Sequence, residues 1–105
     1  MTEGRKGDID ALIASAHASY AARLPGKVAE IAAFAARGDW PEVRRAAHKL
    51  SGSAKTYGFG AVGTAARAIE SILLESQDEP PANGELATLI DRARADAAKA
   101  AGEGA

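Results

Sequence analysis

The chain has 105 residues, which suits one domain with a modest core. Its net charge of −1 lacks the basic excess of nucleic-acid-binding proteins, and the absence of cysteine excludes disulfides and thiolate metal sites. No apolar run reaches the roughly 20 residues that span a bilayer, and the polar N-terminus does not look like a signal peptide. We therefore expect a single cytoplasmic domain over residues 1–105 that binds neither nucleic acid nor membrane, with flexible ends at 1–7 and 102–105.

The first part of the chain predicts helix on both sides of a proline. Alanine, the strongest helix former, is abundant, and β-branched and aromatic residues are sparse, so we expect an all-α fold. The first helix should cover residues 8–23, with Asp8 as its N-cap. Its apolar stripe consists of Ile9, Leu12, Ile13, Ala16 and Tyr20. Pro25 should interrupt or kink this helix. A second helix should cover residues 27–37, and Gly38 should end it in the left-handed conformation.

The next helix has the clearest start signal in the chain. Asp39 can cap it, Glu42 can reach back to form a capping box, and Pro41 suits its first turn. It should end at Gly58. Further helices are predicted over residues 61–76 and 85–101, joined by a loop over residues 78–84. Short connections between amphipathic helices favour an antiparallel four-helix bundle, with either an additional N-terminal helix or a kinked first helix.

His48 lies on the polar side of this central helix. The apolar stripe of the helix consists of Val43, Ala47, Leu50, Ala54 and Tyr57. At about 100° per residue, His48 lies about 150° from the middle of the stripe, so its imidazole should point to solvent. Arg44 and Lys55 share its face, and Ser51 and Gly52 are its i+3 and i+4 neighbours. Gly52 costs the helix roughly 0.5–1 kcal/mol relative to alanine, and its missing side chain opens an approach to the imidazole.

The face around His48 has the groups that phosphoryl transfer to a histidine requires. A neutral imidazole nitrogen is a competent nucleophile near neutral pH. Arg44 and Lys55 can supply positive charge, and the Ser51 hydroxyl can donate to a phosphoryl oxygen. The chain has no Walker loop, kinase signature or metal-ligand set, so partners must activate the phosphate. We interpret His17 as an ordinary surface or half-buried residue, because two histidines alone do not make a metal site.

A run of residues around His48 also carries a family resemblance. This run is Ala47, His48, Lys49, Leu50, Ser51, Gly52, Ser53 and Ala54. It resembles the signature of histidine phosphotransfer (HPt) domains, usually Ala-His-x-Leu-Lys-Gly-Ser-Ala, and the likeness extends over residues 36–70. The resemblance implies a four-helix bundle with the exposed histidine on the second bundle helix. It also implies reversible transfer between that histidine and an aspartate of a receiver domain.

The resemblance implies roles for the residues that match the family. His48 would be the phosphoacceptor of a phosphocarrier that is not itself an enzyme. Its partners would be response-regulator receiver domains and a sensor histidine kinase, which can be a hybrid kinase. It would need no cofactor of its own, since the receiver domain brings Mg²⁺, and it would be a monomer.

The main departure from the family is Ser51, which stands where the family has lysine. Lys55, Arg44 or Lys49 can replace that charge, and Lys49 is least favoured because it points about 100° away on the helix. The residues expected to contact partners are Arg45, Lys49, Gly52 and Lys55.

Glu70 takes the family position across from the histidine. In a hairpin that turns between Gly58 and Gly60, it reaches the height of His48, where it can accept from Nδ1–H and leave Nε2 as the nucleophile. It can equally be a solvated acid or pair with Arg67. Two other function classes stay open. One is a binding module that sequesters a receiver or kinase domain without carrying phosphate. The other is a phosphatase, which the lack of a concave set of acids or metal ligands disfavours.

Overall fold

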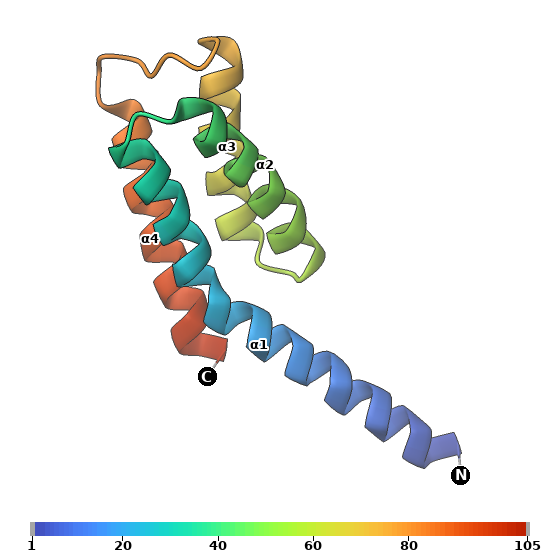
Figure 1. Cartoon of the computed structure of the whole chain (residues 1–105). Helices are drawn as coiled ribbons and strands as arrows, with labels where there is room; N and C mark the ends of the chain where they lie inside the picture. The colour runs from blue at the N-terminus through green and yellow to red at the C-terminus, as the bar shows by residue number, and fades with distance from the viewer. Residues whose placement is uncertain (1, 105) are drawn as a thin grey trace.

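The computed structural model describes residues 2–104 and the side chains of residues 7–103. It contains four helices: α1 (Thr2–Ala36), α2 (Trp40–Thr56), α3 (Gly60–Glu75) and α4 (Glu85–Gly104). Consecutive helices run antiparallel, with α1 packed mainly on α4 and α2 mainly on α3 (Figure 1). The predicted all-α four-helix bundle is therefore confirmed. Among the described residues, no helix combines the length and apolar character needed to cross a membrane.

The first helix is a single kinked helix with no separate N-terminal one. α1 runs for 35 residues with Pro25 in its interior. Proline lacks an N–H and crowds the carbonyl four residues earlier, and Figure 1 shows that α1 changes direction where it leaves the bundle. The prediction that Asp8 is the N-cap is wrong, because the helix already begins at Thr2. Residues 2–7 and 102–104, predicted to be flexible, continue α1 and α4, and residues 1 and 105 lie outside the described part.

The N-terminal part of α1 leaves its apolar side chains uncovered. Of the predicted stripe, only Tyr20 is buried, whereas Ile9 is 55%, Leu12 69% and Ile13 63% exposed. The predicted stripe does lie on a helix, but most of it is uncovered, because α1 projects beyond the other three helices and gives the molecule extents of 60 × 22 × 19 Å (Figure 1). Helical periodicity identifies a face of a helix but does not show whether another element reaches it.

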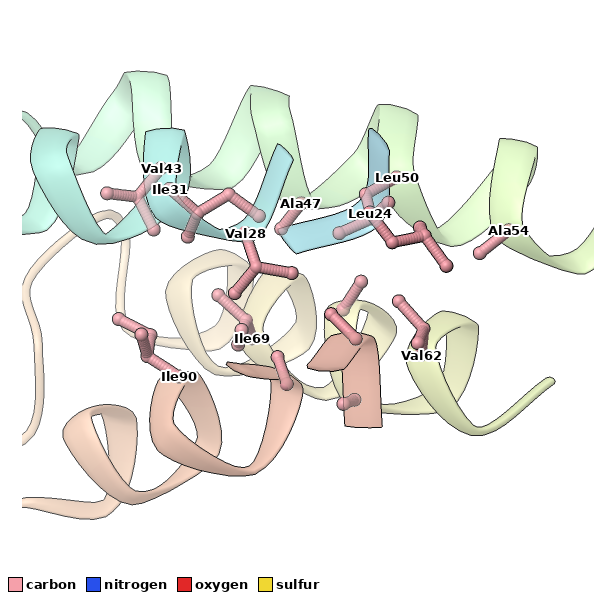
Figure 2. Packing of buried hydrophobic residues seen from close by; sticks show 14 of the residues in the cluster. Leu24, Val28, Ile31, Val43, Ala47, Leu50, Ala54, Val62, Ile69 and Ile90 are labelled. Atoms are coloured by element: carbon pink, nitrogen blue, oxygen red, sulfur yellow. The ribbon is translucent and has the colours of Figure 1, made fainter. Parts of the chain in front are cut away.

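The core lies between the four helices at the C-terminal part of α1 (Figure 2). Its largest fully buried side chains are Leu24, Val28, Ile31, Val43, Val62, Ile69 and Leu73. Burying such a side chain stabilises the fold by about 1.5–3 kcal/mol. The predicted stripe of α2 is confirmed from Val43 to Ala54, but Tyr57 is 38% exposed, because α2 has ended and its ring stacks on Tyr20 at the rim.

The start of α2 is not capped as predicted. Gly38 has a φ of 71°, which confirms that it ends α1 in the left-handed conformation. Asp39, however, makes no side-chain cap hydrogen bond. Its backbone N–H already donates to the Phe34 carbonyl at 3.0 Å, so the capping box has no donor for Glu42. Glu42 pairs with Arg45 one turn along instead.

The α2–α3 hairpin places the two helices very close together. A Cβ atom at Gly63 would lie 3.3 Å from the backbone oxygen of Ser51, a contact that few real Cβ atoms make. In addition, the Tyr20 hydroxyl and Ser53 Oγ share a hydrogen bond of 2.7 Å that ties α1 to α2. The hairpin is therefore held both by its own packing and by α1, which fixes the face that carries His48.

Candidate functional site

His48 projects from the middle of α2 into solvent. Its side chain is 72% exposed, as the angle from the apolar stripe predicts. It lines a surface groove of about 390 Å³ between α2 and α3. The α2 side of the groove is formed by His48, Ser51, Gly52 and Lys55, and the α3 side by Gly60, Gly63, Thr64, Arg67 and Glu70. We call this feature the His48 groove. Both sets of residues recur at helical spacing, so one face of each helix forms it.

Glu70 fixes the orientation of the imidazole. Its Oε2 lies 2.5 Å from His48 Nδ1, and its side chain is only 17% exposed. An ionised carboxylate can only accept, so the proton is assigned to Nδ1, which donates to it. Nε2 then carries the lone pair, and it makes no hydrogen bond to any described residue. The alternative pairing of Glu70 with Arg67 does not occur among these residues.

Gly52 leaves the approach to the imidazole open. A Cβ atom built at this position would meet nothing within 4 Å. No packing contact therefore requires glycine at this exposed helical position. Gly63, on the opposite wall, differs from Gly52, because a side chain there would press on the closely packed backbone of α2. The sequence gives no signal for the role of Gly63, since that role depends on which residues of α2 face it.

Two of the cations near His48 are paired away from the His48 groove. Arg44 donates to Asp78 from Nε at 2.7 Å and from an Nη at 3.3 Å. The hydrogen bond and charge of Asp78, with a smaller contribution from Glu70, raise the pKa of the Arg44 guanidinium above its ordinary value. Arg45 pairs with Glu42. Arg44, predicted to supply charge beside His48, therefore neutralises the loop after α3 instead.

The remaining predicted residues divide between two surfaces. Lys55 lines the His48 groove, whereas Arg45 and Lys49 line a separate groove between α1 and α2. Ser51 lines the His48 groove, but its hydroxyl donates to the backbone oxygen of His48 at 2.9 Å. Its hydrogen is thus already used within α2.

Arg67 and Thr64 are two further residues of the His48 groove that were not predicted as site residues from the sequence. Both are exposed and line the His48 groove from α3. Their spacing from Glu70 was a usable signal, because Arg67 lies one turn before it and Thr64 two turns before it. Among the described residues, no cluster of three or more metal-ligating side chains occurs.

Comparison with known families agrees with this geometry. A model of the Hpt domain family matches residues 15–99. The match covers most of the chain, so the chain belongs to the Hpt domain family. Members of this family are phosphocarrier modules of two-component signalling that interact with receiver domains and kinases, and they are not conventional enzymes. The chain has no significant match to a curated protein or to a solved structure.

Proposed function

We propose that this chain relays a phosphoryl group between aspartates of receiver domains, or from a hybrid histidine kinase, through phospho-His48. The observation that carries the proposal is the imidazole geometry. Nδ1 is held by Glu70 and Nε2 faces solvent without a partner among the described residues. An oriented, neutral nitrogen on an exposed helix face is what a docked phosphodonor needs.

The transfer balances without a proton leaving the imidazole. The Nε2 lone pair attacks phosphorus, the P–O bond of the donor aspartyl phosphate breaks, and its electron pair stays on the aspartate as carboxylate. Nδ1 keeps its proton, so the ring becomes a cation, which the Glu70 carboxylate stabilises at 2.5 Å. The reverse sequence delivers the group to the aspartate of the next receiver domain.

The partners supply what the chain does not carry. The receiver domain provides the aspartate and the Mg²⁺ that neutralises the transferring group. We propose that it docks over Gly52, where nothing covers the backbone, and that Lys49, Lys55 and Arg45 contribute to partner contacts. The chain acts in this scheme as a cytoplasmic monomer.

Labelling from a phosphorylated receiver domain tests the proposal. We expect the full chain to acquire acid-labile, base-stable phosphate, and His48→Gln to acquire none. His17→Gln is the matched control, because His17 is the other histidine and is also exposed. It should be labelled like the unmodified chain. Label that persisted in His48→Gln would refute the acceptor. Binding of the receiver without any transfer would favour a sequestering module, and rapid release of free phosphate would favour a phosphatase.

A further inference from the structure

The cations around His48 differ in what they contact. Arg44 is tied to Asp78 and Arg45 to Glu42. Lys55 and Arg67 make no ion pair with any described side chain, and both line the His48 groove. They approach it from opposite walls, Lys55 from α2 and Arg67 from α3. The groove therefore has two unpaired cations facing a neutral nucleophile.

We propose that Arg67, assisted by Lys55, binds the phosphoryl oxygens on His48 Nε2. This inference rests on the proposed function. Arg67 lies one helical turn before Glu70, the residue that contacts the imidazole, so it belongs to the same wall of the groove as Glu70. The planar fork of a guanidinium matches two oxygens of a phosphoryl group, which an ammonium cannot do.

The small residues of the His48 groove make room for this contact. Gly60 lies on the same face of α3 as Arg67, and Gly52 lies opposite on α2. A Cβ at Gly52 or Gly60 would meet nothing within 4 Å, so the groove is open at both of these positions. Two long cationic side chains and a phosphoryl group can share this space.

The charges of the groove balance when His48 is phosphorylated. A protein-bound phosphoryl group carries about −1.5 to −2 near neutral pH. The imidazolium formed in the transfer is matched by Glu70, at 2.5 Å from Nδ1. The phosphoryl charge is then matched by Arg67 and Lys55. Before transfer the same groove has a net charge of about +1, which attracts the anionic donor.

Arg67 and Lys55 exchange no proton and form no covalent bond in the transfer. The P–O bond of the aspartyl phosphate breaks and the P–N bond forms as described above, while the two cations hold the three peripheral oxygens. In such a loose, in-line transfer, positioning and charge stabilisation are the main contributions a protein can make.

The ionisation of the phosphoryl group tests this inference separately from the relay. The full chain is charged with phosphoramidate, whose P–N bond breaks as ammonia leaves, and the ³¹P shift of phospho-His48 is followed against pH. We expect Arg67→Gln to raise the phosphoryl pKa by about half a unit or more, because a nearby cation favours the dianion. Arg92→Gln, which removes the same charge from the exposed side of α4, should leave it unchanged.

A conservative variant separates contact from folding. Arg67→Lys should restore part of the shift, since it keeps the charge and loses the fork. Arg67 is exposed, so all three variants should keep the melting temperature of the parent chain. Transfer from a phosphorylated receiver should slow about 10-fold in Arg67→Gln, which is the cost of about one charge-assisted hydrogen bond.

The two hypotheses fail in different ways. If Arg67→Gln and Arg92→Gln give the same phosphoryl pKa and the same transfer rate, the role of Arg67 is overturned while phospho-His48 stands. If no receiver domain labels His48 but phosphoramidate does, with the Arg67-dependent shift, then the anion site stands and the relay fails.

Discussion

Single residues at the site are distinguished by their contacts more than by their type. Four basic residues stand on α2, and the structure places only Lys55 in the His48 groove. Glu70 differs from Glu75, the other acid of α3, because it contacts the imidazole and is mostly shielded from water. Such a carboxylate holds the ring in one tautomer, and in the proposed transfer it would stabilise the cation that phosphorylation of His48 creates.

Replacing Glu70 by glutamine should therefore slow phosphotransfer while leaving the fold intact. The amide can accept one hydrogen bond from Nδ1, but it cannot neutralise the imidazolium. The difference between a charge-assisted and a neutral hydrogen bond is about 1.4 kcal/mol, which corresponds to about a 10-fold slower transfer. The initial rate of labelling from a phosphorylated receiver measures it. Glu75→Gln on the same helix is the control, and equal rates for the two variants would contradict the role of Glu70.

The sequence was enough to predict that His48 is exposed and that Glu70 can contact its Nδ1, but not which cations form ion pairs. The position of His48 follows from the periodicity of one helix, and its 72% exposure agrees. The pairing of Arg44 depends on Asp78, which lies 34 residues away on a loop with a left-handed backbone. No local pattern predicts where such a loop folds back. Arg67 differs from Arg44, because its spacing of one turn before Glu70 was a local signal that could have placed it beside the same groove.

At the scale of the helices, two glycines in the same hairpin have opposite functions. Gly52 lies where a side chain would meet open space, and Gly63 lies where a Cβ would press on the backbone of α2. Helix propensity treats the two alike, because each is unfavourable inside a helix. Only the packing of α2 on α3 shows that Gly52 leaves His48 accessible, whereas Gly63 allows the two helices to pack closely.

Substitution of the two glycines should move stability in opposite directions. Gly52→Ala should stabilise the fold by about 0.5–1 kcal/mol, because it relieves the backbone entropy of glycine without a clash. It should also slow transfer by covering the approach to His48. Gly63→Leu should destabilise the fold by about 2 kcal/mol, because the side chain forces α2 and α3 apart. Denaturant unfolding measures both, and a Gly52→Ala variant that lost stability would show that the site is not open.

At the scale of the whole molecule, α1 has two functions along one continuous helix. Its C-terminal part supplies Leu24, Val28 and Ile31 to the core, and its N-terminal part stands clear of the bundle (Figure 1). Most of the stability of helices in proteins comes from tertiary packing, so the N-terminal part relies on its continuity with the packed part. Apolar residues recur at helical spacing in both parts, so the sequence predicts helix in both but does not show which part is buried.

Truncation of one leucine from each part of α1 should show this difference. Leu24→Ala should lower the free energy of unfolding by about 2–5 kcal/mol, because Leu24 is fully buried and leaves a cavity. Leu12→Ala should change it by less than about 0.5 kcal/mol, because that side chain is 69% exposed. Both are measured by chemical denaturation at two protein concentrations. A large loss for Leu12→Ala that grew with concentration would mean that a second copy covers the N-terminal part of α1, since only association makes unfolding depend on concentration.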